Sequence, residues 1–228
     1  MMKLLSRAQS APSHMERSYV LQRKGMAWLG LAFPAAFLLS SVVGRTAFQD
    51  SISDYYWTLG LERNFFVGAL FSIGAFLYLY KGASWAEDRL LDLAGVLAIL
   101  VAFVPTPNAA TTAAAESFSW HGLFAATFFV CIALYCVSMT FVTLPVEGRA
   151  RRRRERFKAQ YILCTIAILA SVAFAVVFHF TGVPIFWPEA FAVWAFSAFW
   201  YLQTRELDPS RPWIPLIWKQ NPAAEEAA

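Results

Sequence analysis

The residues of this sequence that can do chemistry are few, and most of them stand just before or just after long apolar runs. The segment SISDYY contains Asp54 and Tyr55, His121 opens an apolar run, and Glu189 lies near the start of the last one. A carboxylate, a phenol and an imidazole can together bind a polar ligand or transfer protons. We therefore expect a small polar site where the ends of these runs meet.

Arg63 stands at the start of the second apolar run. The N-terminus of a helix carries partial positive charge, so an Arg there needs a negative partner, for which Asp54 and Glu62 are the candidates. In the alternative interpretation, Arg63 and the first backbone amides of the helix hold an anion such as a lipid phosphate. Arg45 is expected to be solvated. We expect a polar pocket at the outer ends of the helices that binds a lipid headgroup or a similar anion. The expected ligand-binding residues are Asp54, Tyr55, Arg63, His121 and Glu189.

Two other classes of function stay open. His121 and His179 are the only histidines outside the N-terminal tail, and with Glu189 and Asp54 they offer the ligands of a zinc site in a metal-dependent membrane hydrolase. Ser117 and His121 share a helix face, but a nucleophile pair also needs an orienting group. The other alternative is a small-solute or proton-coupled transporter. The lipid-headgroup interpretation requires no metal and no cofactor.

The chain that carries these residues has the composition of a membrane protein. Of its residues 58% are hydrophobic and 15% charged, against about 25% charged in soluble domains. Six apolar runs approach the roughly 20 residues that a spanning helix needs, namely 26–43, 64–80, 90–104, 121–144, 161–181 and 184–203. None alternates apolar with polar residues, which argues against a barrel. We predict an all-α integral membrane bundle of six transmembrane helices.

The positions of Lys and Arg predict the orientation of this bundle. Of the 19 basic residues, 17 fall in the two tails and in the second and fourth loops, and only Arg45 and Arg63 fall in the other loops. Basic residues are retained on the cytoplasmic side, which places both termini there, in a bacterial inner membrane. The predicted parts are a cytoplasmic basic tail (1–25), the transmembrane domain (26–203) and a cytoplasmic tail (204–228).

The net charge of +4 comes mostly from the segment 149–158, which contains RRRRERFK. We interpret it as a loop that anchors the topology next to anionic lipid. Membrane lipids are therefore the expected partners, and nucleic acid is not. In the third apolar run, Asp92 is expected to pair with Arg89, since a bare carboxylate inside a membrane is costly.

Small residues and cysteines have structural interpretations. Gly68 and Ser72 in the second run, like Gly122 and Ala126 in the fourth, are spaced for close helix contact. The three cysteines fall inside apolar runs, with no spacing typical of a disulfide or a zinc site. We expect them to be buried and free.

The order of the motifs resembles a known family. The segments SISDYY, ERNFFVGALFSIGAFLYLYKG, LAGVLAILVAFVPT and PIFWPEAFAVWAF, with a His opening the fourth run, are similar to a group of six-span bacterial membrane proteins related to the eukaryotic DRAM, Sfk and Frag proteins. The resemblance covers about residues 51–200 and implies a lipid-facing role without naming a reaction. The residues on family-motif positions are Ser53, Tyr55, Arg63, Gly68, Pro105, Thr106, His121 and Glu189.

Overall fold

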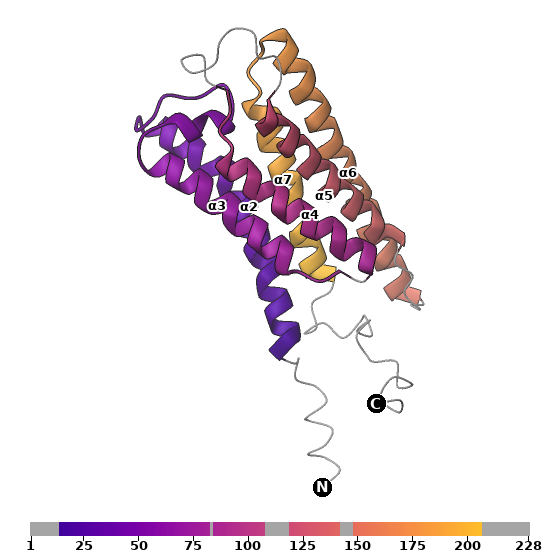
Figure 1. Ribbon diagram of the computed structural model, residues 1–228. Coiled ribbons are helices and arrows are strands. Elements are labelled where there is room, and N and C mark those ends of the chain that lie inside the picture. The colour runs from indigo at the N-terminus through magenta and orange to yellow at the C-terminus, as the bar shows by residue number, and fades with distance from the viewer. Residues whose placement is uncertain (1–13, 83, 108–118, 142–147, 207–228) are drawn as a thin grey trace.

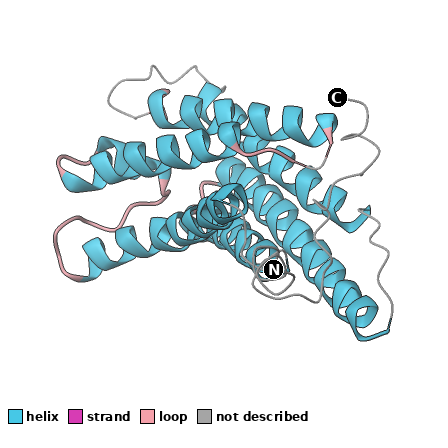
Figure 2. Ribbon diagram, turned by 90° about the horizontal axis from the view of Figure 1, so that it is seen from below, coloured by secondary structure: helices cyan, strands magenta, loops and turns pink. Residues whose placement is uncertain are grey.

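The computed structural model describes residues 14–82, 84–107, 119–141 and 148–206. These residues form six α-helices and one short 3-10 helix, and no strand occurs among them (Figure 2). In chain order the elements are α2 (His14–Val42), η1 (Ser53–Trp57), α3 (Leu61–Leu79), α4 (Trp85–Phe103), α5 (Trp120–Phe141), α6 (Gly148–Thr181) and α7 (Phe186–Glu206). The predicted all-α class is confirmed for this part of the chain.

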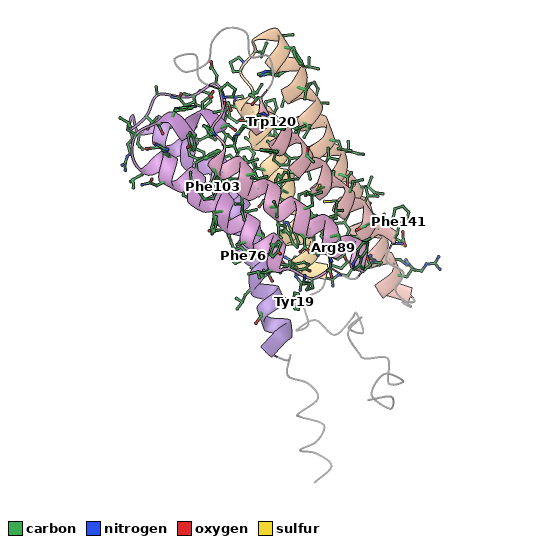
Figure 3. All side chains as sticks on the ribbon, viewed as in Figure 1. Tyr19, Phe76, Arg89, Phe103, Trp120 and Phe141 are labelled. Carbon is green, nitrogen blue, oxygen red and sulfur yellow. The ribbon has the colours of Figure 1, made fainter. Side chains whose placement is uncertain are left out.

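The helices form one bundle in which neighbours in sequence are neighbours in space. Each helix from α2 to α7 packs against the next, and α7 also packs against α2, which closes the ring. α2 begins and α7 ends at the lower end of the bundle, while the connection that contains η1 lies at the upper end (Figure 1). Trp120 and Phe141, the first and last residues of α5, mark these two ends (Figure 3). We call them the η1 end and the opposite end.

Three of the six described helices are long and apolar enough to cross a membrane by length and composition, within the segments Ser18–Val42, Trp120–Phe141 and Arg151–Thr181. The other three, α3, α4 and α7, have 19 to 21 residues and carry charged side chains in their terminal turns. Each of the six predicted spans thus coincides with a helix over most of its length. That all six cross the membrane, with both termini in the cytoplasm, stays a prediction.

The outward faces of the helices are apolar. Every one of the described helices exposes large hydrophobic side chains, among them Trp28, Phe71, Leu93, Leu134, Leu163 and Phe191. Large apolar side chains exposed in such number are costly in water and favourable in hydrocarbon. The surface therefore agrees with a lipid environment.

α3 and α4 pack closely together at Gly74 and Gly95. A Cβ added at either glycine would lie 2.7 Å from the backbone oxygen of the other. Gly68 has open space around it, and Gly122 faces only Ser119, so the prediction that these two glycines pack against other helices was wrong. Spacing alone did not show which face of each helix meets a neighbour.

The opposite end of the bundle is joined by a buried ion pair. Arg154 on α6 and Glu206 on α7 are 6% and 2% exposed and bond to each other. Arg154 also donates to the Met139 backbone oxygen at 2.6 Å, and the Tyr161 hydroxyl donates to Glu206. These bonds connect the ends of α5, α6 and α7.

Two predictions about charged residues have opposite outcomes. The basic segment 149–158 is not a loop, because α6 begins at Gly148 and runs through it. The Arg89 guanidinium lies 3.8 Å from the Asp92 carboxylate, which confirms that pair, and Lys81 approaches the same carboxylate at 3.9 Å.

The three cysteines are buried and free, as predicted.

Candidate functional site

Glu189, in the first turn of α7, holds the loop before η1 against the bundle. Its Oε2 accepts the Ser51 hydroxyl at 2.9 Å and the Ile52 backbone N–H at 2.6 Å, and Ser53 Oγ lies 3.4 Å from its Oε1. In the other direction, the Asp50 backbone oxygen accepts the N–H groups of Ile185, just before α7, and of Phe186, its first residue, both at 2.8 Å. The loop therefore caps the helix, and the helix satisfies the polar groups of the loop.

His121, in the first turn of α5, joins this loop to the end of α4. Its Nδ1 lies 2.6 Å from the Val104 backbone oxygen and its Nε2 lies 2.9 Å from Ser53 Oγ. A carbonyl oxygen only accepts, so Nδ1 carries the hydrogen, and in the neutral ring Nε2 accepts the Ser53 hydroxyl. The imidazole is 4% exposed and lies nearly parallel to the Phe66 ring. Its orientation is thus fixed on both sides.

These residues line a cavity of about 710 Å³ at the η1 end, between α5, α6 and α7, which we call the η1 cavity. Its polar lining includes Ser51, Ser53, Asp54, His121, His179 and Glu189. Its apolar lining includes Leu123, Phe129, Val172, Val176, Ile185 and Pro188. Val176 and Phe180 on α6 are exposed, so the wall formed by α6 borders the outside of the bundle.

A smaller cavity of about 60 Å³ lies deeper in the bundle and is lined mainly by apolar residues, including Phe33, Phe66 and Phe128. Ser53 and Glu189 line this space as well as the η1 cavity. The two residues therefore stand between the inner space and the outer one.

The lining of the η1 cavity is acidic. Asp50, Asp54 and Glu189 line it, whereas no Lys or Arg does so in the described part of the chain. Burial raises the pKa of Asp54 above its ordinary value, the Asp50 charge raises it further, and a hydrogen bond with the Ser51 backbone acts in the opposite direction. Such a lining favours ligand groups that donate hydrogen bonds or carry positive charge.

The structure brings together three of the five predicted ligand-binding residues. Asp54, His121 and Glu189 line the η1 cavity, and Tyr55 and Arg63 do not. Tyr55 is fully buried, stacks on Phe37 with ring centroids 4.5 Å apart, and bonds through its hydroxyl to Ser41 at 2.7 Å. Tyr55 is therefore a core residue that anchors η1 to α2.

Arg63 is exposed, and its expected pairing with Asp54 or Glu62 is not found. Its guanidinium lies 4.6 Å from the centre of the Tyr56 ring and donates to the Tyr56 hydroxyl at 3.2 Å. Glu62, 8% exposed, instead accepts the Ser40 hydroxyl at 2.5 Å and lies 4.0 Å from Arg45. Arg45 is therefore exposed but paired, and the predicted anion site at Arg63 is not part of the cavity.

The four ligands of the alternative metal site, His121, His179, Glu189 and Asp54, all line the η1 cavity. In the described ranges, however, no three His, Cys, Asp or Glu side chains lie close enough together to hold a metal ion. Both ring nitrogens of His121 are already bonded within the protein. The geometry thus gives no support to the zinc interpretation.

Ser53 is the functional candidate that the residue-by-residue interpretation missed. From the spacing in the sequence, Ser117, four positions before His121, was the candidate partner. Ser117 lies outside the described residues. The structure pairs His121 with Ser53, 68 positions earlier in the chain. The one sequence signal for Ser53 was its place on a family-motif position.

Comparison with known proteins gives one match. A model of the Frag1/DRAM/Sfk1/Cwh43P N-terminal domain matches residues 38–202. No curated protein and no solved structure matches this chain. The matched range contains η1, all of α3, α4, α5 and α6, and every residue that bonds to Glu189 or His121. Because the match covers well over half of the sequence, the chain belongs to the Frag1/DRAM/Sfk1/Cwh43P family of membrane proteins.

Proposed function

We propose that this protein binds a membrane lipid in the η1 cavity, with the headgroup against the polar residues of the η1 loop and an acyl chain along α5 and α6. The observation that carries the proposal is the composition of the cavity wall. The η1 segment and the first turns of α5 and α7 contribute hydroxyl, imidazole and carboxyl groups. The walls formed by α5 and α6 are mainly apolar, with Ser171 and His179 as the polar residues of α6. A headgroup joined to a hydrocarbon chain matches both parts.

The charge of the lining favours a particular class of headgroup. Three carboxyl groups and no Lys or Arg among the described lining residues disfavour an anion. Ammonium and hydroxyl groups can donate to Asp54 and Glu189. We therefore infer a lipid whose headgroup carries such donors and no net negative charge, and phosphatidylethanolamine is the practical probe.

Two glycines provide a matched pair of variants for the test. Gly122 on α5 lines the η1 cavity, and Gly68 on α3 does not. A Cβ at Gly122 would meet only Ser119, and one at Gly68 would meet nothing within 4 Å. A Phe is therefore expected to fit at both positions, but only Gly122→Phe fills the cavity.

The full-length wild type and both variants are reconstituted with equal amounts of phosphatidylethanolamine and phosphatidylglycerol, and retained lipid is identified by native mass spectrometry. The wild type and Gly68→Phe are expected to retain phosphatidylethanolamine in preference, and Gly122→Phe to lose it. Equal retention by the two glycine variants would overturn the proposal. A preference for phosphatidylglycerol would overturn the assignment of the headgroup.

We further propose that all six helices span a bacterial inner membrane with both termini in the cytoplasm. Ala47 and Ala86 are exposed alanines on either side of α3, and the described cysteines are buried, so background labelling is low. Ala47→Cys is expected to react with an impermeant thiol reagent in intact spheroplasts, and Ala86→Cys only after permeabilisation. The reverse labelling pattern would show that the helices have the opposite orientation in the membrane, which would contradict the proposal.

A further inference from the structure

Ser53, His121 and Val104 form a hydrogen-bonded series that has the geometry of a nucleophile, a base and an orienting group. Ser53 Oγ lies 2.9 Å from His121 Nε2, within the range for direct proton transfer. The Val104 backbone oxygen, 2.6 Å from Nδ1, holds the hydrogen on that nitrogen and turns the lone pair of Nε2 toward the serine. Activated serines are recognised by this relation between three groups and not by their order in sequence.

Three other hydroxyl groups on the η1 cavity, those of Ser51, Thr106 and Ser119, have different partners. The Ser51 hydroxyl donates to Glu189, and Ser119 Oγ accepts the Gly122 backbone N–H at 3.1 Å. Thr106 Oγ1 contacts a backbone oxygen at 3.4 Å. Ser53 Oγ also lies 3.4 Å from Glu189 Oε1, but among these four hydroxyls it alone bonds to an imidazole, at 2.9 Å.

The position of Ser53 suits a reaction on a lipid. It lies where the polar and apolar parts of the η1 cavity meet, and it also borders the smaller apolar cavity beneath. In an ester-linked lipid the acyl carbonyl lies at the same junction, between the headgroup and the hydrocarbon chain. A lipid seated with its headgroup at Asp54 thus places its ester group in the region of Ser53.

We propose that Ser53 is the nucleophile and His121 the general base of an acyl-transfer reaction on an ester-linked membrane lipid. This inference rests on the proposed lipid binding in the η1 cavity and adds a reaction to it. Ser53 Oγ bonds to the acyl carbon as its proton passes to His121 Nε2. The ester C–O bond then breaks, and the leaving oxygen takes that proton and departs as an alcohol.

The second half of the reaction restores the enzyme. Water or an acceptor alcohol gives a proton to His121 Nε2 and bonds to the acyl carbon. The bond between that carbon and Ser53 Oγ breaks, and Oγ recovers the proton from His121. With water the products are a fatty acid and the deacylated lipid, and with an acceptor alcohol the product is a new ester.

The test uses diisopropyl fluorophosphate, a small probe whose phosphorus is attacked by an activated serine as fluoride leaves. The purified full-length protein is treated, digested, and the labelled residue located by mass spectrometry. We expect labelling at Ser53, none in Ser53→Ala, and a rate about 10²-fold lower in His121→Gln. Ser72→Ala, which changes a hydroxyl bonded to the Gly68 backbone oxygen of its own helix and away from the η1 cavity, is expected to label like the wild type.

A second variant keeps the test decisive if His121→Gln folds poorly. In Ser53→Cys, the rate of alkylation by iodoacetamide is measured as a function of pH. Because His121 pairs with the thiol, we expect the rate to level off at a pH well below the ordinary thiol pKa of about 8.5. An unlabelled Ser53 in folded wild type, or a Ser53→Cys profile like that of a free thiol, would overturn the reaction. Loss of lipid retention in Gly122→Phe is measured separately, so failure of the reaction and failure of lipid binding are distinguishable.

Discussion

Glu189 on α7 accepts the backbone N–H of Ile52 at 2.6 Å, although the two residues are 137 positions apart. The same carboxylate oxygen accepts the Ser51 hydroxyl, so Glu189→Ala leaves two donors without their acceptor. We expect a loss of about 1–3 kcal/mol for each buried group left unsatisfied. The free energy of unfolding in mixed detergent micelles measures it.

Glu155→Ala is the matched control for Glu189. The Glu155 side chain is exposed, and within the described part of the chain its one ion pair is with Lys158, at 3.3 Å. Such surface pairs contribute at most about 1 kcal/mol. Equal losses in Glu155→Ala and Glu189→Ala would show that Glu189 does not hold the η1 loop.

Asp54 makes stability depend on pH in a direction opposite to that of a paired carboxylate. Burial, and then the charge of Asp50, raise its folded pKa above the ordinary value of 3.8. The folded state therefore keeps the Asp54 proton to higher pH than the unfolded state, and stability falls as pH rises through this interval. We expect Asp54→Asn to gain Tm relative to the wild type as pH increases from about 4, until the folded group is fully ionised.

The difference in Tm between Asp54→Asn and wild type, measured at intervals of pH, tests this sign. Asp50→Asn removes the Asp50 charge, which is the smaller of the two causes of the raised Asp54 pKa. It should therefore change the dependence of Tm on pH less than Asp54→Asn does. A gain that shrinks as pH rises would mean that Asp54 is stabilised in its charged form. The expected burial of its carboxyl group against the η1 cavity would then be wrong.

Gly74 and Gly68 lie on the same helix and differ in what surrounds them. A Cβ at Gly74 would lie 2.7 Å from the Gly95 oxygen and from a side-chain carbon of Ile99, and the backbone cannot yield without moving α3 from α4. We expect Gly74→Ala to cost about 1–3 kcal/mol. Gly68→Ala should be neutral or stabilising, because alanine favours the helix. Unfolding of both variants under the same conditions measures the contrast, and equal stability would contradict the close contact.

Arg154 and Arg152 lie two residues apart on α6 and differ in burial. Arg154→Ala leaves Glu206 buried without its guanidinium partner, which we expect to cost about 3–5 kcal/mol. Arg152 is exposed, and its replacement by Ala should change the free energy of unfolding by less than about 0.5 kcal/mol. If both arginines prove equally dispensable, the ion pair does not join α6 to α7.

The positions of the helices followed from hydrophobicity because a spanning segment needs a run of fixed length. The ends were harder, and the basic segment 149–158 shows why. Arg is a good helix former, so a run of arginines next to an apolar helix can extend it as well as end it. Which arginine is buried depends on the partner, and Glu206 lies 52 positions from Arg154.

The candidate site was predictable only in part. Asp54, His121 and Glu189 stand out because polar side chains at the ends of apolar helices need partners. Arg63 was expected beside Asp54 but lies outside the η1 cavity. Consecutive helical residues point about 100° apart, so with Glu62 facing the core Arg63 faces outward. The contact between Ser53 and His121 joins the first residue of η1 to a helix 68 positions later in the chain, so it cannot be predicted from local spacing.

Lipid binding in the η1 cavity can be seen in a structure of the full-length protein in nanodiscs that contain phosphatidylethanolamine. We predict density for one lipid in the η1 cavity, with its headgroup within hydrogen-bond distance of Asp54 and its ester group beside Ser53. An η1 cavity filled by water or by collapsed side chains, with ordered lipid found only on the outer faces of the helices, would contradict it.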